Sequence, residues 1–262
     1  MSTIEYIEKA WIAYKKNFWT IIIALILQCL LISIPFVIGL LPWIIIFFTS
    51  GISLTQSNIV NFILSYLGVF SFSIVMFIIG LFASIVLNGG FVRMLYEGLR
   101  RKTRFEIMLK TAKEKFWTIL GANLLVLLIF LIIIAALFAP IGILLGSNLF
   151  LQEASVFYVF VILSTVVLGV IVLVLISILF VFVNQSIVID NLSAFQAVKK
   201  SFKVSEKNFL NILFLFLIFF IFNNGLYNFL FILGTILTWF VMSPLLLLSY
   251  TAFYVEKRKK FK

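Results

Sequence analysis

The chain has 262 residues, of which 64% are apolar and only 11% are charged. A soluble domain carries roughly 25% charged residues because its surface faces water, so this composition excludes an ordinary soluble protein. The net charge is +11, but the Lys and Arg residues lie beside long apolar blocks. We therefore expect anionic phospholipid headgroups as partners, and no nucleic acid. With no His and a single Cys, the chain has no zinc ligand set and no Ser-His-Asp arrangement, so we expect neither an enzyme nor a cofactor.

The apolar blocks predict an all-α membrane protein with six transmembrane helices. A span needs about 20 apolar residues, and polar segments divide the longest charge-free stretches into pieces of that size. The first five predicted spans cover residues 18–48, 60–90, 117–143, 157–186 and about 208–222. The sequence leaves open whether the fifth is a full span. Because Asn and Gly tolerate left-handed backbone, the turn before the sixth span is expected at Asn223, Asn224, Gly225 and Asn228.

The basic residues predict the orientation of these spans. With six spans, one side of the membrane holds residues 1–17, 93–115, 190–207 and 255–262, and these segments contain all 20 Lys and Arg residues. Positive residues in short loops mark the cytoplasmic side. We therefore expect a multi-pass protein of the plasma membrane with both termini in the cytoplasm.

Three related phrases precede the odd-numbered spans: KKNFWTII around Phe18, KEKFWTIL around Phe116 and SEKNFLNIL around Phe209. Residues four and seven positions upstream of each Phe share one helical face, which predicts a short amphipathic helix before each span. The residues seven positions upstream are Trp11, Leu109 and Phe202, and those four positions upstream are Tyr14, Ala112 and Ser205. A capping box is predicted for each helix, at Ser2 with Glu5, Thr103 with Glu106, and Ser193 with Gln196.

These phrases favour one integral membrane domain, residues 1–262, with no soluble domain and three repeats. The repeats would cover residues 1–92, 93–189 and 190–262, each with an amphipathic interfacial helix followed by a helical hairpin. The alternative is that any lipid–water boundary attracts aromatic and basic residues. That alternative accounts poorly for the Phe-Trp-Thr-Ile run shared by the first two phrases.

Two segments resemble a known family. The first runs from Ser193 to Phe202 and on to Lys207-Asn208-Phe209, and the second is Phe253-Tyr254-Val255-Glu256-Lys257-Arg258 at the end of the last span. They are similar to prokaryotic six-span proteins of unknown function that are related to the membrane domain of glycerophosphoryl diester phosphodiesterases. The resemblance implies a stand-alone membrane module. It brings no phosphodiesterase activity, because that chemistry resides in a separate soluble barrel of about 250 residues.

No Asp, Glu, Lys, Arg or His lies within a predicted span, which argues against an ion-coupled carrier. Two sets of residues are candidate sites. The first set is basic, and it either determines the topology or forms a contact surface for anionic lipid or an acidic partner. Its members are Arg93, Arg100, Arg101, Lys102, Arg104, Lys257, Arg258, Lys259 and Lys260. The second set consists of amide side chains in or near the spans, which either form interhelical hydrogen bonds or make up a polar seam that lines a cavity. Its members are Gln28, Asn88, Asn123, Asn184, Gln185 and Asn224.

The sequence thus predicts a non-enzymatic polytopic membrane protein that organises lipids or partner proteins at the cytoplasmic face. The expected partners are membrane lipids, anionic at that face, and a membrane protein or a second copy of the chain. The alternative function is a passive or accessory transport component for an amphiphilic solute or lipid.

Overall fold

The computed structural model describes residues 3–50, 66–146 and 156–261, and every regular element in these ranges is a helix. In chain order the elements are α1 (Thr3–Lys16), α2 (Phe18–Ser50), α4 (Leu67–Gly98), α5 (Glu106–Glu114), α6 (Phe116–Gly146), α8 (Val156–Leu179), α9 (Val183–Asp190), α10 (Ala194–Glu206), α11 (Phe209–Leu237), the π-helix η2 (Thr238–Met242), α12 (Ser243–Lys257) and the 3₁₀-helix η3 (Arg258–Phe261).

The prediction of six membrane helices is confirmed by length and composition. The six segments that are long and apolar enough to cross a membrane are Phe18–Phe48, Leu67–Gly98, Phe116–Ala139, Phe160–Asp190, Phe209–Leu226 and Ile232–Lys257. The fifth has 18 residues, which is close to the minimum length for a span.

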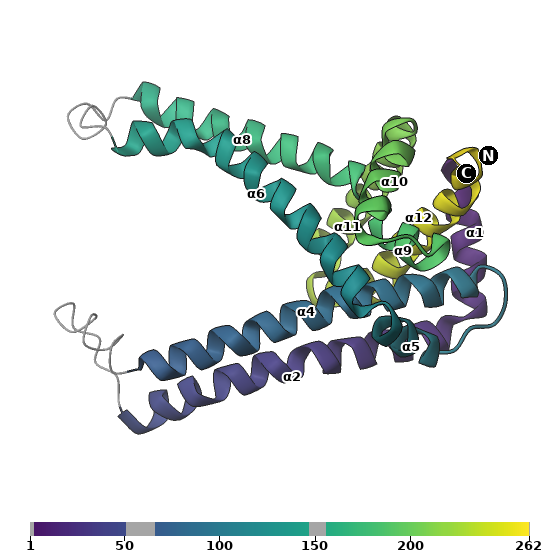
Figure 1. The fold of residues 1–262 in the computed structure, drawn as a ribbon, viewed down its shortest axis with the longest axis horizontal. Helices are drawn as coiled ribbons and strands as arrows, with labels where there is room; N and C mark the ends of the chain where they lie inside the picture. The colour runs from purple at the N-terminus through teal and green to yellow at the C-terminus, as the bar shows by residue number, and fades with distance from the viewer. Residues whose placement is uncertain (1–2, 51–65, 147–155, 262) are drawn as a thin grey trace.

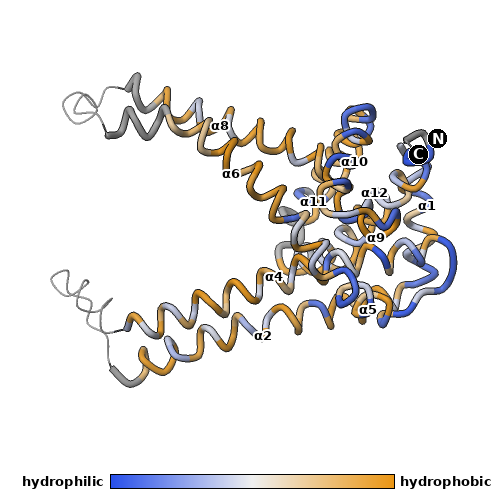
Figure 2. The backbone as a smooth tube through the Cα atoms, in the orientation of Figure 1, coloured by the Kyte–Doolittle hydropathy of each residue, from blue (hydrophilic) through white to orange (hydrophobic). Residues whose placement is uncertain are grey.

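Two long hairpins, α2 with α4 and α6 with α8, diverge from a common base (Figure 1). This base, which we call the basal end, contains α1, α5, α9, α10, α12 and both termini. Hydrophilic residues gather at the basal end, whereas the hairpins are mostly hydrophobic along their length (Figure 2). Large apolar side chains cover the outside of the hairpins, with Phe48 79% exposed and Phe160 69% exposed. Such a surface matches lipid and not water.

The largest buried cluster lies at the basal end and joins elements far apart in sequence. The Phe182 ring stacks on Phe253 with centroids 5.9 Å apart, and Tyr6 meets Phe253 edge-on at 5.0 Å. All three side chains are almost completely buried. The first helix, the residues before α9 and the last helix therefore share one aromatic core, which fixes the basal end.

The three predicted amphipathic helices are present as α1, α5 and α10, and the helix that follows each one begins at Phe18, Phe116 or Phe209. Tyr14, Ala112 and Ser205, which lie four positions before these Phe residues, are all buried. The shared phrases therefore correspond to the same junction in three places, where an amphipathic helix ends and a long apolar helix begins.

The amphipathic helices pack in a cyclic order. Helix α5 packs against α4, α10 packs against α9, and α1 packs against α12 at the other end of the chain. Each amphipathic helix therefore contacts the second apolar segment of the predicted repeat before its own. For α1, in the first repeat, this segment is α12 of the last repeat, which closes the cycle. This order supports the predicted repeats, which stay a prediction.

The close packing of α5 on α4 depends on Gly90. A Cβ atom at this position would lie 2.2 Å from the carbonyl oxygen of Met108, far inside van der Waals contact. Gly90 thus lets the backbone of α5 touch α4, which is a use of glycine that no other residue could replace without movement of backbone.

The fourth predicted span, residues 157–186, is present as Phe160–Asp190, but its helix is interrupted near its end. Helix α8 ends at Leu179 and α9 begins at Val183. The hydroxyl of Ser201 on α10 accepts a hydrogen bond from the Phe182 N–H at 3.1 Å and donates to the Leu179 carbonyl at 3.0 Å. A side chain inserted into the helical ladder in this way breaks the helix.

The reversal before the sixth span also differs from its prediction. Phe219 on α11 and Met242 on η2 line one pocket, although a straight helix would separate them by about 34 Å at 1.5 Å per residue. The chain therefore bends back between these residues. It does so without left-handed residues at Asn223 or Asn224, because Asn191 is the only non-glycine residue with positive φ in the described ranges. The expected left-handed turn is wrong, and Asn224 instead donates to the Phe220 carbonyl at 2.8 Å.

The three predicted capping boxes had different outcomes. Ser193 and Gln196 form the predicted box at the start of α10. Helix α5 begins at Glu106 with Phe105 as its N-cap, so the box at Thr103 is wrong. The Thr103 N–H instead donates to the Oδ1 atom of Asn17 at 2.9 Å. Ser2 lies outside the described residues.

Candidate functional site

A basic pocket lies at the basal end between α1, the end of α4 and the end of α12. Its volume is about 440 Å³, and its charged lining residues are Lys9, Lys16, Arg100, Glu256 and Lys259. Four cations thus face one carboxylate. The uncharged lining includes the apolar residues Ile12, Leu99, Ala252 and Val255, so the pocket combines positive charge with an apolar wall.

The cations reach the pocket because three helices end around it. Helix α1 ends at Lys16, α4 at Gly98 and α12 at Lys257. Each helix C-terminus carries about −0.5 of an elementary charge, so the three ends together contribute roughly −1.5. The charged side chains contribute a net +3 by comparison. The pocket therefore stays positive after the helix ends are counted, and it can attract an anion.

Aromatic rings hold part of the basic surface in place. The Arg100 guanidinium lies 4.4 Å from the centroid of the Tyr96 ring, and Arg93 lies 5.3 Å from the same ring. The Lys257 ammonium lies 5.7 Å from the Phe253 ring. These cation–π contacts orient the charged groups without neutralising them.

Beside the pocket, Tyr6 brings a phenol close to Glu256. Burial raises the pKa of the Tyr6 phenol, and the charges of Glu256 and Glu5 raise it further. Tyr6 therefore stays neutral at physiological pH and adds no negative charge next to the pocket.

A second pocket, between α4, α5 and the end of α9, is lined by four cations and two carboxylates, and three of these cations form ion pairs. Glu97 forms ion pairs with Arg93 at 3.1 Å and with Arg101 at 3.0 Å, and Lys110 pairs with Glu114 at 3.9 Å. All five line this pocket, which has a volume of about 450 Å³. Its four cations and two carboxylates give a net charge of +2, compared with +3 for the first pocket, so the first pocket is the more positive of the two.

Asp190 is the centre of an ionic cluster that the sequence did not predict. Its carboxylate pairs with Lys200 at 2.7 Å and with Arg258, and it accepts a hydrogen bond from the Tyr254 hydroxyl at 2.5 Å. The Tyr254 hydroxyl in turn accepts one from Ser186 at 2.9 Å. Each of the three charged side chains is less than a fifth exposed. This cluster joins α9, α10 and the end of α12, and Arg258 contributes to it by its ion pair with Asp190.

The predicted basic residues therefore fall into separate groups. Arg100 and Lys259 line the basic pocket, Arg93 and Arg101 line the ion-paired pocket, and Arg258 belongs to the Asp190 cluster. Lys102 and Arg104 are exposed outside both pockets.

Lys257 is half-buried against Phe253, and the side chain of Lys260 lies outside the described part of the chain. Lys9 and Lys16 were missed as site residues. Their spacing of seven positions on an amphipathic helix is a signal that places them on one face and could have found them.

The six predicted seam residues do not converge. Asn123 donates to the Oδ1 atom of Asn184 at 3.0 Å and so joins α6 to α9. Asn88 and Asn224 are exposed on α4 and α11. Gln28 on α2 is half-buried, and its Oε1 atom has no hydrogen-bond partner in the described residues.

Gln185 differs from the other amides because it is only 1% exposed while neither its oxygen nor its nitrogen has a hydrogen-bond partner among the described residues. Within those residues there is also no group of three His, Cys, Asp or Glu side chains that could hold a metal ion.

Comparison with known proteins identifies a family whose function is unknown. A family model described as "Domain of unknown function (DUF7847)" matches residues 25–255, so the chain belongs to this family. No curated protein and no solved structure matches the chain. A link to the membrane domain of glycerophosphoryl diester phosphodiesterases is not shown, and that resemblance stays a prediction.

Proposed function

We propose that this member of the DUF7847 family is a non-enzymatic membrane module that organises anionic phospholipids at its basal end. The observation that carries the proposal is the basic pocket, in which four cations and one carboxylate lie beside an apolar wall. A phospholipid presents the matching pair of features, namely a phosphate and an acyl chain. The excess positive charge selects anionic lipids over zwitterionic ones.

The orientation of the protein follows from the same chemistry. The basal end is the hydrophilic end (Figure 2), and it holds both termini. Anionic lipids concentrate in the cytoplasmic leaflet of the plasma membrane, where each nearby Lys or Arg contributes about 1 kcal/mol of attraction. We therefore propose that both termini face the cytoplasm, in agreement with the rule that positive loops stay inside.

The test compares lipid binding by two triple variants of the full chain in phosphatidylcholine nanodiscs. The pocket variant combines Lys16→Gln, Arg100→Gln and Lys259→Gln. The control combines Lys102→Gln, Arg104→Gln and Lys113→Gln, which remove the same charge from exposed side chains outside the pocket. Phosphatidylglycerol is titrated in, and bound lipid is counted by native mass spectrometry.

We expect the pocket variant to weaken phosphatidylglycerol binding by about tenfold or more, because each lost charge contributes on the order of 1 kcal/mol. The control should bind nearly as well as the unmodified protein. Equal losses in the two variants would mean that diffuse charge attracts the lipid, and that the pocket is not a site. Equal binding of phosphatidylcholine and phosphatidylglycerol would contradict the proposal outright.

Passive or accessory transport of an amphiphile is the second candidate function. Its supporting observation is the hydrogen-bonded pair Asn123 and Asn184 between two apolar helices. Gln28, Asn88 and Asn224 lie on other helices, and Gln185, the neighbour of Asn184, makes no side-chain hydrogen bond within the described residues. Transport therefore has less support than lipid organisation. Flux of a fluorescent lipid across proteoliposomes, unchanged when Asn123 and Asn184 are replaced together by Leu, would remove this candidate.

A further inference from the structure

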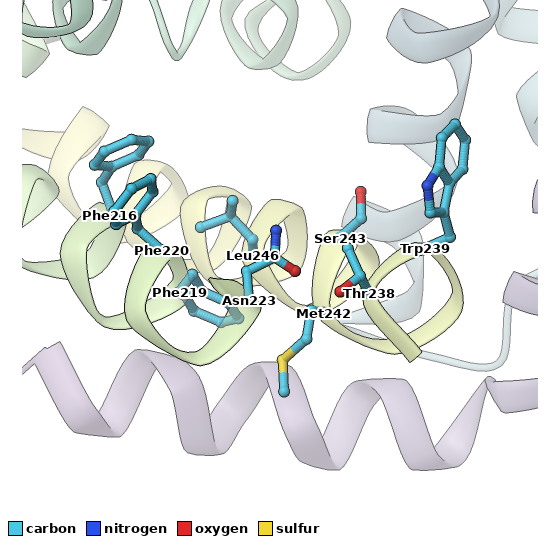
Figure 3. Close-up of a pocket in the computed structure, with 9 residues that line it drawn as sticks. All are labelled: Phe216, Phe219, Phe220, Asn223, Thr238, Trp239, Met242, Ser243 and Leu246. Carbon is cyan, nitrogen blue, oxygen red and sulfur yellow. The ribbon is translucent and has the colours of Figure 1, made fainter. Parts of the chain in front are cut away.

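A third cavity is distinct from the basic pocket and from the ion-paired pocket, with which it shares no described lining residue. It has a volume of about 310 Å³ between α11, η2 and the start of α12 (Figure 3). Its walls include the aromatic residues Phe216, Phe219, Phe220 and Trp239. None of the described residues that line it is charged. Both segments that form it are long and apolar enough to cross a membrane, so the cavity faces lipid and not water.

Two residues that line this cavity each carry a side-chain oxygen that is covered by protein and has no hydrogen-bond partner in the described part of the chain. These oxygen atoms are Oδ1 of Asn223 and Oγ1 of Thr238, and both are buried. In Figure 3 the amide of Asn223 and the hydroxyl of Thr238 turn toward each other from α11 and η2. An unpaired polar atom in an apolar environment costs free energy, so these two atoms mark a place where a ligand can supply the missing partner.

The shape of the cavity comes from the π-helix. The Ser243 N–H bonds to the Thr238 carbonyl five residues earlier, which widens this turn relative to an α-helix. Pro244 has no N–H to donate to the Phe240 carbonyl four residues earlier. The hydroxyl of Tyr14 on α1 donates to that carbonyl instead, at 2.9 Å. The wall of the cavity is therefore anchored from outside, and π-turns of this kind are frequent at functional sites.

The chemistry of the cavity specifies a neutral ligand with a hydroxyl group. Both oxygen atoms are covered by protein, so the Asn223 and Thr238 side chains must rotate to turn them into the cavity. One ligand hydroxyl can then donate to Oδ1 of Asn223 and accept from the Thr238 hydroxyl, and so satisfy both atoms. A carboxylate has no proton to donate to Asn223, and no cation in the lining would stabilise its charge. Water alone fits poorly, because 310 Å³ corresponds to about ten waters at ~30 Å³ each, and each would need two or more polar partners.

We propose that this cavity binds one neutral, hydroxyl-bearing amphiphile, whose hydroxyl lies between Asn223 and Thr238 and whose chain lies against the aromatic wall. This site is separate from the basic pocket and independent of the function proposed for it. A lipid alcohol would enter from the surrounding bilayer.

The probe is a sixteen-carbon alcohol with a diazirine in its chain, photolysed with the full-length protein in phosphatidylcholine nanodiscs. Labelled residues are mapped by mass spectrometry. The matched variants are Asn223→Leu and Asn224→Leu, because Asn224 is the neighbouring amide but is exposed and bonded to its own helix. Thr238→Val is a second pocket variant, and thermal unfolding confirms that each variant is folded.

We expect saturable labelling of α11 and η2 residues. Loss of one hydrogen bond should raise the half-saturating concentration by roughly three- to tenfold in Asn223→Leu and in Thr238→Val, with no change in Asn224→Leu. The unlabelled alcohol should compete and hexadecanoate should not. Unsaturable labelling spread over α2 and α4, equal behaviour of the two Asn variants, competition by hexadecanoate, or no labelling, as for a cavity that holds only water, would each overturn the proposal.

Discussion

The side-chain amide of Asn17 donates a hydrogen bond to the Gly98 carbonyl at 3.1 Å, across 81 positions of sequence. The same amide also donates to the Ala13 carbonyl at 3.0 Å, and its Oδ1 atom accepts from the Thr103 N–H at 2.9 Å. Asn17 is 4% exposed. One buried side chain therefore joins the end of α1, the end of α4 and the loop before α5.

We expect Asn17→Ala to lower the stability of the protein by about 2–3 kcal/mol, because it leaves the Thr103 N–H buried without its partner and removes both donors. The measurement is the midpoint of thermal unfolding in detergent. The matched control is Asn208→Ala, since Asn208 occupies the same place before Phe209 but makes only the local bond to the Val204 carbonyl at 2.8 Å. Equal shifts for the two variants would show that the contacts to Gly98 and Thr103 contribute nothing.

Gly90→Ala should be strongly destabilising, by about 3 kcal/mol or more, because the added methyl would overlap the Met108 carbonyl and push α5 off α4. Gly68→Ala on the same helix is the control, since a Cβ there meets nothing within 4 Å. Alanine favours helix by up to ~1 kcal/mol over glycine, so this control should be neutral or slightly stabilising. Thermal unfolding of the two variants in parallel tests the prediction, which fails if both behave alike.

Asp190→Asn should destabilise the basal end by on the order of 3 kcal/mol, because it keeps the shape of the side chain but leaves Lys200 and Arg258 partly buried without a counter-charge. Glu114→Gln provides the contrast. Its ion pair with Lys110 is more than half exposed, and exposed pairs contribute under about 1 kcal/mol. Chemical denaturation followed by Trp fluorescence measures both. A small effect at Asp190 would mean that water replaces the lost carboxylate.

The sequence was informative where a signal is local. Phe18, Phe116 and Phe209 begin their helices because each follows an amphipathic segment whose buried face ends four positions earlier. Composition alone predicts the six apolar segments, since each must cover about 30 Å of hydrocarbon. Such features depend on residues that are neighbours in the sequence, so they can be predicted without knowledge of the fold.

The remaining features depend on contacts that no local pattern contains. The break after Leu179 requires Ser201 of another helix, and the cluster around Asp190 requires Arg258 from the last turn of the chain. The seam was predicted from residue type alone, although within the described residues the one side-chain hydrogen bond between its members joins Asn123 to Asn184. Interhelical register decides such contacts, and periodicity within one helix does not determine it.

Gln185→Met should raise the stability of the protein, by about 1–3 kcal/mol, because the Gln185 amide is buried with neither polar atom paired in the described residues and an apolar side chain of similar length removes that cost. The neighbouring amide gives a control of opposite sign. Asn184→Leu breaks the bond from Asn123 and should be destabilising. Thermal midpoints of the two variants decide the matter. If Gln185→Met is destabilising as well, the amide has a partner outside the described residues, and Gln185 becomes the first residue to examine for a bound ligand.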